Sequence, residues 1–203
     1  RAELVQVPSR PGVTVPIAIE PPNGPAAAWA LLFVGGDGIL NLSDSGAPRS
    51  VLSSIYVVRS RQHLTDAGIG VVVVDMPGGV GGNPRFRRSP EHMADVGAVV
   101  RTIRQRFKRP VWIVGHSNGG ITAGRAARTL SGAERPDGLV LTSATNIKIR
   151  RDPGAPMNPF PYTGPVLVIA HQSDGCSYSP PSDAPILLAA FTAARPKALR
   201  VFT

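Results

Sequence analysis

Near the middle of the chain, Gly115-His116-Ser117-Asn118-Gly119 has the pattern G-x-S-x-G. An apolar run at 111–114 precedes this pattern, and a stretch with helical spacing at 121–130 follows it. A serine in a turn between a strand and a helix projects its hydroxyl from the edge of the sheet, where it can attack a carbonyl carbon. Glycines are needed two residues on either side, because side chains there would collide with the crossing strand and helix. The sequence therefore predicts Ser117 as a nucleophile.

The elements that must position this serine alternate along the chain. Strands are expected at 3–7, 13–19, 29–34, 69–74, 111–114, 139–142, 166–170 and 198–202, and helices at 51–65, 90–107, 121–130 and 184–194. The first two strands are expected to form a hairpin, and the uniformly apolar 69–74 is typical of a central strand buried on both faces. Strands that alternate with helices predict an α/β fold with a doubly wound, mostly parallel sheet of about eight strands and helices on both faces.

A single domain spanning 1–203 is expected, since we find neither internal repeats nor an interdomain linker. The proline-rich stretch 144–164 is too short for an inserted cap domain.

In this order of elements the chain resembles the α/β-hydrolase family over nearly all of its length. Within the family it is similar to uncapped esterases and lipases of the dienelactone-hydrolase or polyester-depolymerase type. The resemblance implies that Ser117 is the nucleophile. It also implies that Asp174, just after the strand at 166–170, is the acid that orients a histidine base. Asp183 is the alternative acid, although its position is also that of an N-cap for the last helix.

An oxyanion hole needs two backbone N–H groups that face the developing negative oxygen. The resemblance implies that Asn118, which follows the nucleophile, supplies one of them. The glycine-rich turn 35–38 resembles the oxyanion loop of the family and supplies the other, from Asp37 or alternatively from Gly36.

The general base is where the chain departs from the family pattern, which places a histidine after the last strand. None of the four histidines lies there: His63 and His92 belong to predicted helices, and His116 is expected to point away from Ser117. We expect the native polypeptide to continue past residue 203 with the base and a cysteine that pairs with Cys176. His171 is the internal alternative.

Composition limits the other function classes. The net charge is +9, but the arginines are scattered with few aromatics between them, so we expect no nucleic-acid partner. No apolar run approaches the roughly 18 residues of a membrane span. No nucleotide-binding glycine motif is complete and no zinc-ligand spacing occurs, so neither a cofactor nor a metal is predicted. The basic cluster 85–88 is expected to be a solvated loop rather than an anion site.

The sequence thus predicts a serine hydrolase that cleaves a small-molecule or polymeric carboxylic ester through an acyl-enzyme. The alternative is a non-catalytic binding protein on the same fold. A periplasmic or secreted location is expected, with a cytoplasmic one as the alternative, because the chain starts at Arg1 without a methionine. The sequence carries no prediction of the oligomeric state.

Overall fold

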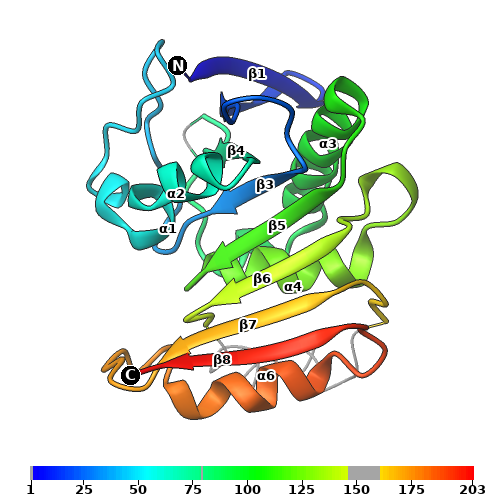
Figure 1. Ribbon diagram of the computed structural model, residues 1–203. Helices are drawn as coiled ribbons and strands as arrows, with labels where there is room; N and C mark the ends of the chain where they lie inside the picture. Colours follow the sequence, from blue (N-terminus) through cyan, green and yellow to red (C-terminus); the bar gives the residue numbers. More distant parts are fainter. Residues whose placement is uncertain (1, 79, 146–160) are drawn as a thin grey trace.

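The computed structural model describes residues 2–78, 80–145 and 161–203. In these residues, eight strands form one sheet in the order β1-β2-β4-β3-β5-β6-β7-β8 (Figure 1). Their bounds are β1 Glu3–Arg10, β2 Val13–Glu20, β3 Ala28–Phe33, β4 Ile69–Val74, β5 Val111–His116, β6 Gly138–Thr142, β7 Val166–His171 and β8 Lys197–Phe202. All pairs from β4 to β8 are parallel, whereas β1 and β2 form an antiparallel hairpin and β2 is antiparallel to β4. The predicted mostly parallel sheet and N-terminal hairpin are confirmed.

Helices cover both faces of the sheet, as the alternation of elements predicts. The bounds are α1 Tyr56–Arg59, α2 Arg61–Asp66, α3 Pro90–Phe107, α4 Gly119–Thr129 and α6 Ala184–Ala190, with short 3₁₀ helices η1 Val51–Ser54, η2 Phe86–Arg88, η3 Gly132–Glu134 and η4 Pro181–Asp183. Side chains of α3, α4 and α6 join the larger apolar core, and those of α1 join a smaller core on the other face. In Figure 1, α1 and α2 lie in front of the sheet and α3 and α4 behind it.

The central strand β4 is buried on both faces, which its uniform Ile69–Val74 composition predicts. Val72 and Val74 belong to the larger core, and Val71 and Val73 belong to the smaller one. Burying each such side chain stabilises the fold by roughly 1.5–3 kcal/mol. These strands therefore form a rigid base for the loops at their carboxyl ends.

Helix α3 begins as its sequence predicts. The hydroxyl of Ser89 accepts a hydrogen bond from the His92 amide at 3.1 Å, and Pro90 takes the first helical position. A proline is well placed there because it has no N–H that would need a partner. Met93 and Ile103 are among the buried residues of its inner face.

The helix predicted over 51–65 is wrong as a single element. It is divided into η1, α1 and α2, with extended backbone at Ile55 and a break at Ser60. The Ser60 hydroxyl and the Ser60 amide both donate to the Tyr56 carbonyl, at 2.6 and 2.8 Å, and a serine hydroxyl bonded in this way often bends a helix. The last predicted helix also ends earlier than expected, at Ala190.

Asp75, at the end of β4, holds the loop that follows β3. Its buried carboxylate accepts backbone hydrogen bonds from Leu40 at 2.7 Å, Met76 at 2.8 Å and Leu42 at 3.0 Å. Three N–H donors offset the cost of burying this charge. The loop after β3 is consequently fixed relative to the sheet edge where Ser117 lies.

Two sequence predictions concern the proline-rich stretch and the membrane-spanning potential of the chain. Most of the proline-rich stretch 144–164 lies outside the described residues. Among the helices of the described part of the chain, none is long and apolar enough to cross a membrane.

Candidate active site

Ser117 lies between the end of β5 and the start of α4, in a backbone conformation that serine rarely adopts. Its φ is +51°, in the left-handed region, which costs about 1–3 kcal/mol for a residue with a Cβ. Hydrogen bonds hold this conformation: the Ser117 amide donates to the Thr142 carbonyl at 3.1 Å, and the Ser117 carbonyl accepts from Gly120 at 2.9 Å and Thr145 at 3.0 Å. The strand–turn–helix placement is the one that the G-x-S-x-G pattern predicts.

The glycines around Ser117 are required by close backbone contacts. A Cβ atom on Gly115 would lie 2.5 Å from the Gly119 carbonyl oxygen, and one on Gly119 would lie 2.0 Å from the Phe33 carbonyl oxygen. Gly35 is a third such position, which the sequence did not identify. A Cβ atom there would lie 2.8 Å from the Cβ of Ser117. The end of β3 is thus packed directly against the candidate nucleophile.

The turn after β3, residues 35–38, has the geometry expected of a tight glycine turn. The Gly38 amide donates to the Gly35 carbonyl at 3.1 Å, and Gly36 has φ +57°, which a turn of this kind requires at its second residue. We call residues 35–38 the oxyanion turn. The side-chain amide of Asn118 donates to the Gly36 carbonyl at 3.1 Å and thereby joins this turn to the elbow.

The backbone amides predicted to form the oxyanion hole belong to Asn118 and to Asp37 or Gly36. In residues 2–78, 80–145 and 161–203, no acceptor takes a hydrogen bond from the amides of Gly36, Asp37 or Asn118. The Asp37 carboxylate is turned to its own loop and accepts from the Ile39 amide at 3.0 Å. Two or three N–H donors beside Ser117 are suited to stabilise a negative oxygen.

The prediction for the basic cluster 85–88 is wrong for Arg87. This side chain has no exposed surface and donates hydrogen bonds to the carbonyl of Gly36, in the oxyanion turn, and to that of Val34, just before it, instead of facing solvent or an anion. Burial lowers its pKa to about 10, while the nearby charge of Asp37 acts in the opposite direction.

Asp174 lies at the same edge of the sheet as Ser117. It follows β7, which is parallel to β5 with β6 between them, and its amide donates to the His171 carbonyl at 3.0 Å. One carboxylate oxygen accepts from the Cys176 amide at 3.0 Å. The alternative acid, Asp183, takes the N-cap position of α6, but its side chain makes no capping hydrogen bond.

His116 is packed away from the serine hydroxyl, as the sequence predicts. Its Nδ1 lies 2.8 Å from the Thr142 hydroxyl. Its ring packs edge-on against the Tyr56 ring, with 5.9 Å between the ring centroids. Burial lowers the pKa of His116, and the charge of Asp174 partly opposes this shift. Asp174 is therefore within electrostatic range of the His116 ring.

None of the four histidines, all within the described residues, hydrogen-bonds to Ser117. His92 is buried on α3 with a pKa lowered to about 3, mainly by desolvation. His63 is exposed on α2. His171 is exposed at the end of β7, where its Nδ1 accepts a hydrogen bond from the Ser173 amide at 3.1 Å.

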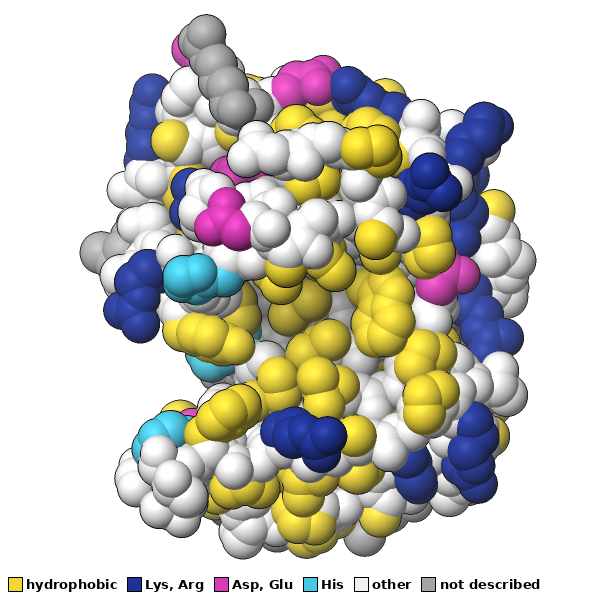
Figure 2. Space-filling model, viewed as in Figure 1, with side chains coloured by type: hydrophobic (Ala, Val, Ile, Leu, Met, Phe, Trp, Pro, Cys, Tyr) yellow, Lys and Arg dark blue, Asp and Glu magenta, His cyan; other side chains and the backbone are white. Residues whose placement is uncertain are grey.

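The surface is hollowed at the carboxyl edge of the parallel strands. Figure 2 shows this hollow on the side toward which the arrowheads of β5 and β6 point in Figure 1, with histidine side chains on both of its walls. Hydrophobic side chains cover much of the neighbouring face. β5 also ends at this edge of the sheet, immediately before Ser117.

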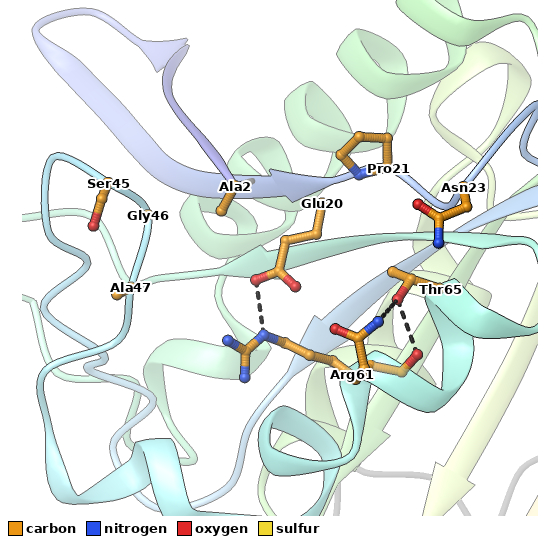
Figure 3. Close-up of a pocket in the computed structure, with 10 residues that line it drawn as sticks. Ala2, Glu20, Pro21, Asn23, Ser45, Gly46, Ala47, Arg61 and Thr65 are labelled. Carbon is orange, nitrogen blue, oxygen red and sulfur yellow. Dashed lines mark hydrogen bonds and ion pairs between the residues drawn. The ribbon is translucent and has the colours of Figure 1, made fainter.

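A different pocket of about 300 Å³ lies beside β2 and α2 (Figure 3). Its lining is polar, and the Arg61 guanidinium donates to the Glu20 carboxylate within it at 2.7 Å. Ser117 does not line this pocket. Its hydroxyl residues, Ser45 and Thr65, do not stand in a strand–turn–helix elbow, so we do not assign this pocket the chemistry of Ser117.

The comparisons with known proteins place this geometry among hydrolases. The family model described as "Serine aminopeptidase, S33" matches residues 53–167. A serine hydrolase without a lid from Xanthomonas campestris superimposes with a TM-score of 0.67 at 18% identity, covering 100% of this chain and 84% of the other. A serine hydrolase homologue from Coxiella burnetii gives 0.67 at 15%, covering 100% and 86%.

An esterase from Pyrococcus furiosus gives a TM-score of 0.69 at 12% identity, covering 100% of this chain and 82% of the other. At these identities the likeness concerns the fold, and it confirms the α/β-hydrolase fold. Among curated proteins, none matches the sequence.

Proposed function

The chain belongs to the hydrolase family described as serine aminopeptidase, S33, and from this premise we propose that it cleaves carboxylic esters with Ser117 as nucleophile. The observation that carries the proposal is the strained backbone of Ser117, φ +51°, at the end of β5. Strain of this kind persists only where the surroundings impose it, and it gathers at functional sites. Here it presents a hydroxyl beside amides that have no other acceptor in the described part of the chain.

The reaction follows from these positions. The Ser117 oxygen attacks the ester carbonyl carbon, and the carbonyl oxygen becomes an oxyanion that accepts hydrogen bonds from the Asn118 and Asp37 amides. The base takes the serine proton and passes it to the departing alkoxide, which leaves as an alcohol. Water then attacks the acyl-enzyme by the same route and releases the acid.

The base has two candidate sources, and Asp174 supports either. His171 ends β7, two strands from β5, so about 10 Å separates the two strand axes. Its imidazole would have to reach across β6 to take the Ser117 proton. The other candidate, which our sequence analysis expects, is a histidine outside residues 1–203.

Esters are the substrate class that this site favours on chemical grounds. An alkoxide is a better leaving group than an amine anion, so ester cleavage depends less on a well-placed acid–base residue. The name of the family makes aminoacyl amides the second class to test.

The decisive test is covalent labelling with a fluorophosphonate, followed by peptide mass analysis. We expect the adduct on Ser117 and none in Ser117→Ala. The same proteins are assayed with p-nitrophenyl esters and with aminoacyl p-nitroanilides, which separates the two substrate classes. His171→Asn should abolish labelling if the base is internal and leave it unchanged otherwise. A wild-type protein that is inert to every reagent would support the non-catalytic binding protein instead.

A further inference from the structure

Arg87 lies beneath the oxyanion turn and is the largest completely buried side chain of the described residues. All of its hydrogen-bond acceptors in this part of the chain are neutral. A buried cation without a carboxylate partner is costly, because it gives up its hydration. This costly group is buried directly against the carbonyls of Val34 and Gly36, just before and within the oxyanion turn.

Three of the four hydrogen bonds of Arg87 go to backbone carbonyls. Nη2 donates to Val34 at 2.9 Å and to Gly36 at 3.4 Å, and Nε donates to Gly82 at 2.6 Å. The Gly82 amide in turn donates to the Asp37 carbonyl at 2.5 Å. The guanidinium therefore contacts the oxyanion turn directly at Gly36 and indirectly, through Gly82, at Asp37. It also binds the carbonyl of Val34, just before the turn.

The fourth hydrogen bond reaches the helix that follows the nucleophile. Nη1 donates to the Thr122 hydroxyl at 3.1 Å, on α4. That hydroxyl lies 2.9 Å from Nε2 of His92. Since Arg87 can only donate, the Thr122 proton is left for the neutral His92 ring. The oxyanion turn, α4 and α3 are thus joined through one side chain.

We propose that Arg87 is the positioning residue of the oxyanion hole. It fixes the Gly36 carbonyl, and because the peptide bond is planar, the same contact fixes the direction of the Asp37 N–H. A lysine has three donors on a point charge and a methionine has none, so neither reproduces the planar set of bonds. This inference rests on the proposed function, in which the Asp37 amide binds the oxyanion.

Amide hydrogen exchange tests, without any substrate, whether Arg87 holds the oxyanion turn in place. In Arg87→Met, we expect the Gly38 and Gly82 amides to exchange at least about tenfold faster, because the turn is released. The Leu40 amide is the internal reference, since its acceptor is Asp75 rather than the turn. In Arg87→Lys, the exchange rates of these amides should lie between those of the wild-type protein and of Arg87→Met. This variant provides the comparison with the wild-type protein if Arg87→Met does not fold.

Arg10→Met is the matched control. It removes another arginine, one that donates to the buried Asp95 at 2.8 and 3.0 Å, from a contact between the hairpin and α3. Arg10→Met should lower the stability of the protein but leave the ratio of the Gly38 and Leu40 amide exchange rates unchanged. If Arg87→Lys or Arg87→Met also leaves that ratio unchanged, Arg87 does not position the turn and the proposal is wrong.

Ester kinetics test whether the position of the turn affects catalysis. We expect kcat to fall by about 10²-fold in Arg87→Met with KM nearly unchanged, as for the loss of one oxyanion donor. A loss of fold alone would lower the active fraction, and burst titration with fluorophosphonate measures that fraction. If the wild-type protein is not labelled at all, the proposed function fails while the exchange experiment still decides the role of Arg87. Loosened exchange with an unchanged kcat would overturn the positioning role.

Discussion

Replacing Gly35 by alanine tests the contact between the end of β3 and the nucleophile. The added Cβ would lie 2.8 Å from the Cβ of Ser117 and 3.2 Å from its hydroxyl oxygen. Ordinary contacts of this kind begin at 3.4 Å, so the two segments must separate by about 0.6 Å. The φ of Gly35 lies outside the left-handed region, so the substitution adds crowding without backbone strain.

The cost to stability should be moderate and the cost to activity large. Overpacking of this size costs typically 1–3 kcal/mol, which lowers the melting temperature of a domain of this length by roughly 2–12 °C. A misplacement approaching 1 Å at the reacting atoms can reduce the rate by about 10²-fold. The displaced groups are the serine hydroxyl and the turn that carries the Asp37 amide, so the loss should appear in kcat.

The assay compares Gly35→Ala with Gly78→Ala by thermal unfolding, fluorophosphonate labelling and p-nitrophenyl ester hydrolysis. Gly78 is the matched control, since a Cβ there meets nothing within 4 Å and its φ is not left-handed. The reasoning is refuted if Gly35→Ala melts at the wild-type temperature and labels at the wild-type rate.

Three other substitutions have defined outcomes. Gly119→Ala would place a Cβ 2.0 Å from the Phe33 carbonyl oxygen, so we expect the free energy of unfolding in urea to fall by at least about 4 kcal/mol, or no folded protein. Asp75→Asn replaces an acceptor oxygen by a donor facing backbone amides, and the same titration should show a loss of about 2–3 kcal/mol. His92→Gln should remove a pH dependence: the unfolded imidazole binds a proton below pH 6.5, but the folded one only near its lowered pKa of about 3. Wild-type stability should therefore fall by up to about 2 kcal/mol more than that of His92→Gln between pH 6.5 and about pH 5; parallel curves for the two proteins would contradict this.

The strands and the elbow could be predicted because their signals are local. The uniform apolar run at 69–74 and the Ser89-Pro90 start of α3 depend only on neighbouring residues, and the structure places both as expected. The G-x-S-x-G pattern likewise contains Gly115 and Gly119, where an added Cβ would collide with backbone atoms. The division of 51–65 was missed because the Ser60 hydroxyl bonds its own helix, an option that helical spacing does not reveal.

The buried polar groups of the site could not be predicted, because their partners come from distant segments. Arg87 takes acceptors 53 residues earlier at Val34 and 35 residues later at Thr122. In the sequence it stands between the exposed Arg85 and the half-buried Arg88, and no pattern distinguishes it from them. Thr142 had a weak signal, since it ends the strand beside the elbow strand, where its backbone faces Ser117.

The contact between Gly119 and the Phe33 carbonyl has a consequence for the time course of folding. Residues 33 and 119 belong to distant parts of the chain, because β4 and α3 lie between β3 and β5 in the sequence. Contacts of such sequence separation form slowly, because a long loop must close first. The left-handed serine backbone, packed against Gly35, cannot be completed before this pairing. A refolding chain should thus recover its helical circular dichroism before it recovers reactivity toward fluorophosphonate, so that the reagent reports the docking of β3 on β5.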